Sequence, residues 1–382
     1  MRIGLNLLFL LPNEVGGTET YATSLIEAIS NIDHQNEYFL FVNAESAGKQ
    51  WNVGPNFHPV TCPIRATNRA ARFVWEQLVF PFQAIQYRLD VVHSLGYTSP
   101  RFLCAKSVVT IHDLNYLAIP QAFTPFTLWV QKIFVTQSAK RADHIITVSH
   151  FVCREIVHHL GVRSSKITTV YEAPKNLASR AAASPVGLRT EFGITQPYIL
   201  AFSSRSPHKN IARLVEAFQQ AIPFLRDDYQ LIIAGHLPTS NVVPSSENES
   251  LSGSNRVITT GFIEDHEIFS LLSNATLLAF PSLYEGFGLP VLEAMDLSIP
   301  VICSRAASLP EIVEDAAYMF DPYNVNEISR CLIAVLNDPI AQEKLIEKGV
   351  QNRKRFSWER AARETLQVYT RVTSDQDTNV CK

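Results

Sequence analysis

The stretch that decides the fold reads Phe280-Pro281-Ser282-Leu283-Tyr284-Glu285-Gly286-Phe287-Gly288-Leu289-Pro290-Val291-Leu292-Glu293-Ala294-Met295. It predicts a buried strand that ends near Pro281, then a loop with two glycines. A helix follows, with Pro290 in its first turn, where the missing N–H of proline costs nothing. A strand, a glycine loop and a helix in this order are typical of an open α/β sheet that binds its ligand at the carboxyl ends of its strands.

The loop between this strand and this helix is a candidate anion site. The backbone N–H groups of Phe287, Gly288 and Leu289 should emerge at the helix N-terminus, where a negative charge is favoured. Gly286 and Gly288 have no side chain that would keep a phosphate away from the backbone. The sequence therefore predicts a phosphate-binding loop over residues 286–289.

Two carboxylates flank the loop. Glu293 lies one turn into the expected helix, and helical side chains lean toward the N-terminus, so it can reach a hydroxyl group beside the phosphate, such as a ribose. Glu285 lies at the loop entrance and can meet the other end of the same ligand. The alternative is that both only cap or solvate the helix, as an isolated pair at this spacing would.

Short β-branched runs alternate with longer helical patterns along the whole chain, which is typical of parallel sheets with crossover helices. We expect strands near 1–6, 37–42, 57–61, 90–93, 107–111, 143–147, 166–170, 198–203, 230–235, 256–260, 276–281, 300–303 and 317–320. We expect helices near 18–31, 69–88, 125–141, 150–160, 209–222, 264–273, 290–297, 308–314 and 324–337, with further helices to about 371. Turn formers between 171 and 189 predict a boundary between domains 1–180 and 181–382.

Length and composition agree with two such domains. The chain has 382 residues, of which 46% are hydrophobic and 18% charged, and its formal net charge is −3. This balance argues against a nucleic-acid partner, because no excess of cations is available. The six cysteines are scattered without a Cys-x-x-Cys pair, which fits a reducing cytosol. No stretch approaches the roughly 20 apolar residues of a membrane span, and we expect a cytoplasmic protein.

A second constellation is Ser203-Ser204-Arg205-Ser206-Pro207-His208-Lys209-Asn210, which joins the first strand and first helix of the second domain. Arg205 is a planar fork and Lys209 a point charge, and two cations at a strand–helix turn suit a diphosphate. The alternative is a solvated basic loop. The expected position at the carboxyl edge of the sheet, beside the glycine loop, favours binding.

Two further sites lie in the first domain. Gly16 and Gly17 form a turn before a helix, with Thr18 as a possible N-cap, and offer another cluster of backbone amides. The strand near 107–111 delivers His112 to its carboxyl end. A histidine in such a place is usually structural. His93 ends the preceding strand, and we expect it to line the wall of a cleft at the carboxyl edge of the sheet.

The 280–295 segment resembles the donor-site signature of glycosyltransferase family 4 (GT4), whose members are retaining enzymes. The resemblance extends through 232–235, 260–262, 299–302 and 309–313 to the helix start Phe356-Ser357-Trp358-Glu359 and covers nearly the whole chain. It implies the α/β fold named GT-B, in which two Rossmann-like domains face an interdomain cleft. The first domain would bind the acceptor and the second the nucleotide sugar, and the last helix, at about 358–371, would cross back to the N-terminal domain.

The resemblance also implies roles for individual residues. Arg205 and Lys209 would hold the donor phosphates, Glu285 the sugar hydroxyls and Glu293 the ribose. The Thr-x-His-Asp run that ends in Asp113 is similar to mannosyltransferase-like members, in which the histidine lies near the transferred sugar. The implied catalytic residues are His112, Glu285, Arg205 and Lys209. The implied donor-binding residues are Gly16, Gly17, Arg205, Lys209, Gly261, Glu285, Gly286, Phe287, Gly288, Leu289 and Glu293.

The expected reaction transfers a hexose from a nucleotide sugar to a glycan or lipid-linked acceptor. The first choice of donor is GDP-mannose, which would make mannose the transferred sugar. We expect no cofactor and no metal, because the chain has no Asp-x-Asp pair of the kind that holds a divalent ion on a diphosphate. Two alternatives stay open. Nucleotide-sugar 2-epimerases share the two-domain architecture, and a silent nucleotide-sugar-binding subunit would carry the same motifs.

The stretch 65–88 allows two interpretations. Arg65, Arg69 and Arg72 precede a series of large apolar residues, namely Phe73, Trp75, Leu78, Val79, Phe80 and Phe82. A membrane-surface patch attracted to anionic lipid would have this composition. A core helix with a basic first turn would have it too, and we favour that interpretation while leaving peripheral contact with the inner membrane surface open.

Overall fold

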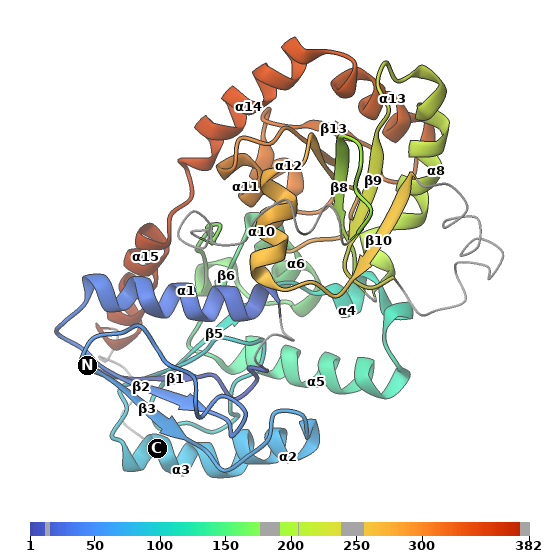
Figure 1. Ribbon diagram of the computed structural model, residues 1–382. Helices are drawn as coiled ribbons and strands as arrows, with labels where there is room; N and C mark the ends of the chain where they lie inside the picture. The colour runs from blue at the N-terminus through green and yellow to red at the C-terminus, as the bar shows by residue number, and fades with distance from the viewer. Residues whose placement is uncertain (12–15, 176–191, 205, 238–255, 375–382) are drawn as a thin grey trace. The chain divides into compact units, whose positions relative to one another are not determined.

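The computed structural model describes residues 1–11, 16–175, 192–204, 206–237 and 256–374 (Figure 1). The chain divides into two compact units. Unit 1 comprises Met1–Ala173 together with Phe356–Lys382, and unit 2 comprises Pro174–Arg355. Each unit is an α/β structure built around one parallel sheet.

Unit 1 contains a seven-stranded parallel sheet in the order β3-β2-β1-β4-β5-β6-β7. Its strands are β1 (Arg2–Asn6), β2 (Glu37–Val42), β3 (Phe57–Thr61), β4 (Val91–Ser94), β5 (Lys106–Ile111), β6 (His144–Thr147) and β7 (Ile167–Thr169). Its helices are α1 (Gly17–Ile32), α2 (Arg69–Val74), the π-helical η1 (Trp75–Val79), α3 (Phe80–Gln86), α4 (Asn115–Ala118), α5 (Pro125–Arg141), α6 (His150–Leu160) and α15 (Trp358–Ser374), with short 3₁₀ turns η2 (Pro120–Ala122) and η3 (Ser164–Lys166).

Unit 2 contains a six-stranded parallel sheet in the order β10-β9-β8-β11-β12-β13. Its strands are β8 (Tyr198–Phe202), β9 (Gln230–Ala234), β10 (Val257–Gly261), β11 (Leu277–Phe280), β12 (Val301–Ser304) and β13 (Tyr318–Phe320). Its helices are α8 (Ile211–Ala221), α10 (Asp265–Ser273), α11 (Leu289–Asp296), α12 (Leu309–Val313), α13 (Val325–Leu336) and α14 (Pro339–Arg353), with 3₁₀ turns η5 (Pro207–Lys209) and η6 (Ile222–Phe224).

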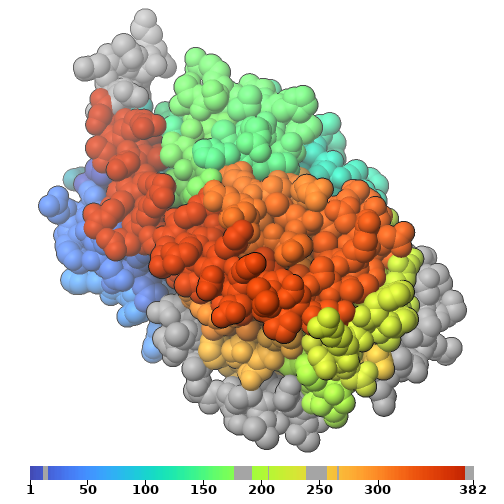
Figure 2. Space-filling view, turned by 90° about the horizontal axis from the view of Figure 1, so that it is seen from above, coloured from blue at the N-terminus to red at the C-terminus, as the bar shows by residue number. Residues whose placement is uncertain are grey.

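The strands are apolar on both faces because helices cover the sheet from both sides. In unit 2, α8 and α13 pack on one face, where Phe218 and Leu332 join Phe320 in a core whose members are almost fully buried. In unit 1, α3 supplies Phe80 to a core that includes Phe41 of β2. Helix α15 packs against α1, and Figure 2 shows this red segment beside the blue N-terminal residues of the same unit.

The helix expected near 69–88 is present over 69–86, but it is not a regular α-helix, because the π-helical turn η1 lies in its middle. The backbone N–H of Phe80 donates to the carbonyl of Trp75, five residues earlier, which is π-helical geometry. Pro81 follows directly; it has no N–H and its ring clashes with the carbonyl four residues before it. A local π turn accommodates that clash.

The preferred interpretation of this segment as a core helix is confirmed for one of its faces only. Phe80 is fully buried, but Leu78 and Phe82 are 63% and 73% exposed, and Val74 and Ile85 are exposed as well. These four exposed side chains recur at helical spacing, and we call them the apolar stripe. One face of the segment packs into the core, and the apolar stripe stays outside it.

Candidate active site

The two constellations of unit 2 lie at one edge of its sheet. The turn η5 follows β8, and the 281–288 loop follows β11. Strands β8 and β11 are parallel neighbours, with Ile199 beside Leu277, so both loops leave the sheet at its carboxyl edge. The carbonyl of His208 accepts a hydrogen bond of 2.8 Å from the backbone N–H of Leu283, which joins the loops directly.

Lys209 and Glu285 form an ion pair across these loops. The Lys209 Nζ donates to Glu285 Oε1 at 2.7 Å, and the two side chains are only 17% and 16% exposed. Nζ also lies 5.2 Å from the centre of the Phe280 ring. Burial alone would raise the pKa of Glu285, but the Lys209 ammonium, together with smaller contributions from His208 and Ser282, holds this pKa below its ordinary value. Glu285 is therefore an anion at neutral pH.

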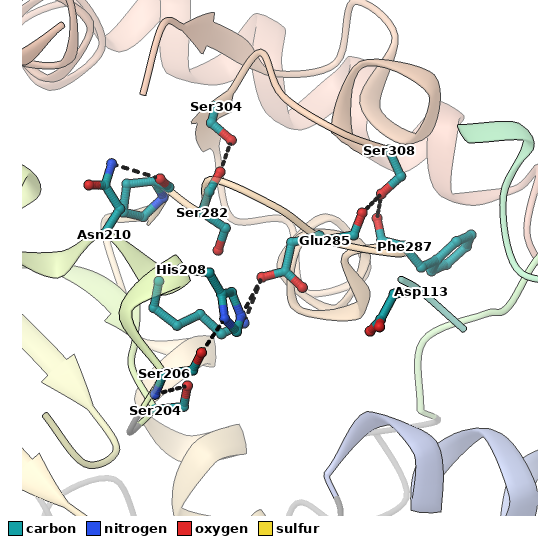
Figure 3. Close-up of polar contacts among 12 residues, drawn as sticks. Asp113, Ser204, Ser206, His208, Asn210, Ser282, Glu285, Phe287, Ser304 and Ser308 are labelled. Atoms are coloured by element: carbon teal, nitrogen blue, oxygen red, sulfur yellow. Dashed lines mark hydrogen bonds and ion pairs between the residues drawn. The ribbon is translucent and has the colours of Figure 1, made fainter. Parts of the chain in front are cut away.

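His208 is a member of the site to which sequence analysis gave no role. Its Nδ1 lies 2.7 Å from Ser206 Oγ, and its Nε2 lies 3.9 Å from Glu285 Oε1 (Figure 3). Burial lowers the pKa of His208 to about 4, although Glu285 opposes the shift. A neutral imidazole beside Glu285 leaves Lys209 as the main counter-charge of that carboxylate.

Two polar side chains far away in the sequence fix the glycine loop. Ser308 Oγ lies 2.9 Å from the carbonyl oxygens of both Glu285 and Phe287 (Figure 3). Asn210 Nδ2 donates to the carbonyls of Pro281 at 3.1 Å and Pro322 at 2.8 Å. Sequence reasoning missed both, because neither contact has a local signature. The one usable signal was Asn210 itself, since asparagine tolerates the left-handed conformation that it adopts here, with φ 56°.

The loop leads into α11 as expected. Gly288 is the N-cap, with φ 110°, and a Cβ there would lie 2.7 Å from the Leu309 side chain, so only glycine fits. Leu289 begins the helix, and the first N–H groups of a helix have no intrahelical acceptor. Glu293 lies half-buried on this helix, in its second turn. The structure thus brings Glu285, residues 286–289 and Lys209 together.

Gly261 ends β10 and meets a second glycine. Gly235 has φ 112° and donates its backbone N–H to the Gly261 carbonyl at 3.0 Å. A Cβ on Gly235 would lie 2.3 Å from the Ser203 carbonyl oxygen. The ends of β8, β9 and β10 can approach one another here only because Gly235 has no side chain.

The N-terminal glycines lie in unit 1. Gly16 has φ 61° and is the N-cap of α1, which begins at Gly17. The expectation of Thr18 as N-cap is wrong: the helix starts one residue before it, and no side chain caps the end. The Gly16 carbonyl instead accepts the backbone N–H groups of Glu19 and Thr20, both at 3.1 Å.

His112 is held by partners within unit 1. Its Nε2 lies 2.8 Å from the Leu95 carbonyl oxygen, and its Nδ1 lies 3.3 Å from Glu172 Oε1. Both partners carry acceptor oxygens, and the two contacts together fix the orientation of the ring. The ring also meets Tyr21 edge-on at 4.7 Å. Glu172 was missed by sequence reasoning, because its place beside His112 depends on the order β5-β6-β7 in the sheet.

His93 is not the cleft-wall residue that we expected. It is fully buried, with Nδ1 2.6 Å from the hydroxyl of Tyr369 on α15 and Nε2 2.8 Å from Thr110 Oγ1. Burial lowers its pKa to about 3, so the ring is neutral. A strand-end histidine looks available in the sequence, but the C-terminal helix, more than 200 residues later, covers it.

Arg205 lies outside the described residues. Within the described ranges, no group of three or more His, Cys, Asp or Glu side chains is arranged to hold a metal ion. No helix in that part of the chain is long and apolar enough to cross a membrane.

Comparison with solved structures identifies the fold of this chain. The sucrose-phosphate synthase of Thermosynechococcus elongatus shares the fold with a TM-score of 0.73 at 20% identity, covering 98% of this chain and 99% of that one. Anabaena HepE, in complex with UDP and glucose, gives a TM-score of 0.71 at 18% identity, covering 97% and 100%. The fold is therefore the GT-B fold of two Rossmann-like units.

Sequence comparison then gives the family. Residues 189–352 match the family described as Glycosyl transferases group 1, and residues 15–173 match Glycosyltransferase Family 4. The O-antigen chain mannosyltransferase B of Escherichia coli is 30% identical over 285 residues, 74% of each chain. The serotype-specific mannosyltransferase WbdA of the same species is 29% identical over 290 residues, 72% of this chain but 34% of that protein. The chain belongs to the GT4 family and is a hexosyltransferase.

Proposed function

We propose that this glycosyltransferase transfers mannose from GDP-mannose, with retention of configuration, to a glycan or lipid-linked acceptor in polysaccharide or glycolipid biosynthesis. The observation that carries the proposal is the buried Lys209–Glu285 pair beside the glycine loop. The choice of mannose is supported by the similarity to the mannosyltransferases above and to the O-antigen chain mannosyltransferase RfbU of Salmonella typhimurium, which is 28% identical over 224 residues.

The pair has a different task before and after the donor binds. Without donor, Lys209 and Glu285 neutralise each other in a site that is largely closed to water. A donor diphosphate would attract the Lys209 ammonium, and sugar hydroxyls would then become the hydrogen-bond partners of Glu285. Because the two side chains start in contact, phosphate and sugar are recognised together.

The same groups would stabilise the leaving diphosphate. Lys209, Arg205 and the amides at the start of α11 would stabilise the negative charge that grows as the sugar–phosphate bond breaks. Glu293 would bind the ribose, and Gly261 would border the nucleotide. We propose that these groups balance the charge without a metal ion.

The acceptor side of the proposal rests on unit 1. Gly16 and Gly17 would border the diphosphate, and His112 would orient the transferred sugar. The Nδ1 contact of His112 with Glu172 is the longer of its two hydrogen bonds. A sugar hydroxyl would replace or join that contact while the Leu95 carbonyl keeps the ring in place.

We further propose that unit 1 docks on the cytoplasmic surface of the inner membrane. The apolar stripe is exposed, and a cationic patch lies on the same unit, where the Arg101 and Arg141 guanidinium groups lie 5.2 and 5.6 Å from the ring of the exposed Phe102. Exposed apolar residues with nearby cations favour an anionic bilayer.

A thermal-shift panel tests the donor class. GDP, UDP, ADP and their common sugars are added without metal and then with EDTA. A ligand at about a hundredfold excess over its Kd should stabilise the folded protein by about 2.7 kcal/mol. We expect a selective shift with GDP and GDP-mannose that survives EDTA. A shift confined to UDP or ADP would overturn the choice of donor, and no shift at all would contradict the donor site.

A further inference from the structure

A large cavity lies entirely within unit 1, between α2 and α5. Its volume is about 600 Å³, within the usual range of ligand sites. Its walls are mostly apolar and carry several aromatic rings, among them Phe9, Phe73, Phe123, Phe126, Trp129 and Phe134. Phe9 can lie there because Gly96 has no side chain: a Cβ would come within 2.6 Å of the Phe9 ring. Nothing in the donor chemistry of unit 2 uses this cavity.

Polar atoms without partners line this apolar cavity. Arg72 Nε and Gln131 Oε1 are buried and have no hydrogen-bond partner among the described residues. A buried polar group without a partner lowers stability, and more so when it is charged. A ligand that supplied the missing partners would recover this cost. The Gln131 side-chain amide can also turn and present its NH₂ group, because its two ends have the same shape.

The polar end of the cavity is cationic. Arg72 Nε lies 4.0 Å from Glu76 Oε1, too far for a hydrogen bond, and Glu76 is 2% exposed. Burial raises the pKa of Glu76 to about 7, although Arg72 opposes the shift. Glu76 therefore balances the Arg72 charge only in part at neutral pH. Arg69 lines the same cavity and is exposed at its edge, which adds a second positive charge.

An aromatic wall with a cationic end fits an amphiphile. We propose that this cavity binds the lipid end of the acceptor, with the aliphatic chain against the aromatic wall and an anionic phosphate against Arg72 and Arg69. This inference deepens the proposed function and rests on it for the role of the lipid as acceptor. The guanidinium of Arg72 can hold two phosphate oxygens at once, which suits a head group of this kind.

The probe is dodecyl phosphate, titrated calorimetrically into the full chain below its micelle-forming concentration, with dodecanol as the uncharged comparison. We expect wild type to bind dodecyl phosphate about tenfold more tightly than dodecanol, and Arg72→Gln to lose this preference. Ala70 lies exposed at the edge of the cavity, so Ala70→Trp should narrow the opening without disturbing the core and weaken both ligands about tenfold.

Matched variants make the result decisive. Val130→Trp fills the cavity from α5, and Ala47→Trp adds the same bulk at an exposed site away from it. Equal binding by wild type, Ala70→Trp and Val130→Trp would overturn the proposal, and an unchanged head-group preference in Arg72→Gln would overturn the phosphate assignment. The titration contains no nucleotide, so its failure is distinct from failure of the donor panel.

Vesicles of phosphatidylglycerol distinguish the two sources of such a lipid. We expect Val130→Trp to bind these vesicles as wild type does while losing dodecyl phosphate, because the cavity holds a single acceptor molecule. If Val130→Trp lost the vesicles as well, the occupant would be a bilayer phospholipid, and the acceptor assignment would be wrong.

Discussion

The Lys209 ammonium lies 2.7 Å from the Glu285 carboxylate, although 76 residues separate them in the chain. Each group is nearly closed to solvent, and each is the other's main counter-charge. When a donor binds here, Lys209 should move to its phosphate and Glu285 to its sugar, so the ion pair between them must break. The two residues should therefore act as one unit in catalysis.

The first prediction concerns that unit. Lys209→Met removes the phosphate-binding cation, and Glu285→Gln removes the sugar-binding carboxylate while keeping its shape. We expect each to lower kcat/KM by about a hundredfold or more. The double variant should lose far less than the product of the two, because the groups are coupled. Steady-state transfer assays measure this, with Lys344→Met on the exposed face of α14 as control. Full turnover by Lys209→Met would refute the site.

The pair also predicts a pH dependence. In wild type the pKa of Glu285 lies below its ordinary value near 4.5, because Lys209, with smaller contributions from His208 and Ser282, opposes the effect of burial. The stability that the carboxylate contributes is thus present above pH 4.5 and lost as pH falls through the lower folded value. In Lys209→Met burial is opposed only by the weaker effects of His208 and Ser282, so the pKa of Glu285 should rise. The acid limb of the residual kcat/KM profile should move to higher pH; a limb at the wild-type position would contradict the pairing.

The second prediction concerns His93 beneath α15. Its pKa is about 3 in the folded protein and 6.5 when unperturbed, so below pH 6.5 the unfolded chain binds a proton that the folded protein excludes. Stability should therefore fall as pH drops from 6.5 toward 3, by about 2 kcal/mol at pH 5. Urea unfolding at pH 7 and pH 5 measures the loss.

The variant His93→Gln should lose about 2 kcal/mol less than wild type between these two pH values. Buried His144, whose pKa is lowered to about 4, contributes with the same sign in both proteins and cancels in the difference. His34→Gln, on an exposed site after α1, is the control and should behave as wild type. Equal pH dependence in His93→Gln and wild type would show that His93 is protonated in the folded protein.

The third prediction concerns the meeting of glycines at the ends of β9 and β10. Gly235→Ala would place a Cβ 2.3 Å from the Ser203 carbonyl at a φ of 112°. We expect a loss of at least about 2 kcal/mol in stability and loss of the nucleotide-dependent thermal shift, because Ser203 begins the phosphate-side loop. Gly48→Ala faces open space and should change stability by less than about 0.5 kcal/mol. If nucleotide raised the melting temperature of Gly235→Ala as much as that of wild type, Gly235 would not contribute to the donor site.

The fourth prediction concerns the apolar stripe. Phe82→Glu places a charge where 73% of the side chain is exposed, so the fold should persist. Binding to phosphatidylglycerol vesicles should fall several-fold in a sedimentation assay, because the variant loses apolar contact and gains repulsion. The matched control is Ile340→Glu in unit 2, where the side chain is 63% exposed. Equal losses in both variants, or none in Phe82→Glu, would exclude the stripe as the docking surface.

Much of this protein follows from local sequence. Apolar β-branched runs fix the parallel strands, and the expected strands agree with the observed ones to within about two residues at each end. Glycine and proline fix the 281–290 turn, because Gly288 adopts φ 110° and Pro290 suits a first helical turn. These are properties of a residue and its immediate neighbours, so no distant partner is needed to infer them.

Other features could not be predicted from local sequence, and the reason is specific in each case. The helix over 69–86 contains a π-helical turn just before Pro81, and a periodic pattern does not register such a turn. The apolar residues of that segment point to both faces, and periodicity cannot tell a core face from an exposed one. His93 was misjudged because its covering partner, Tyr369, comes from the far end of the chain.

The sequence by itself determined the element order, the glycine loop, and the kinds of side chain that serve phosphate and sugar, because backbone conformation and charge are carried by individual residues. Only the tertiary structure decided which of them meet. Lys209 reaches Glu285 because β8 and β11 are neighbours in the sheet, Glu172 reaches His112 through the order β5-β6-β7, and the cavity of unit 1 exists because α2 and α5 pack with a gap between them. Such contacts depend on strand order and helix packing, which are fixed by the burial of the whole core and not by any short stretch.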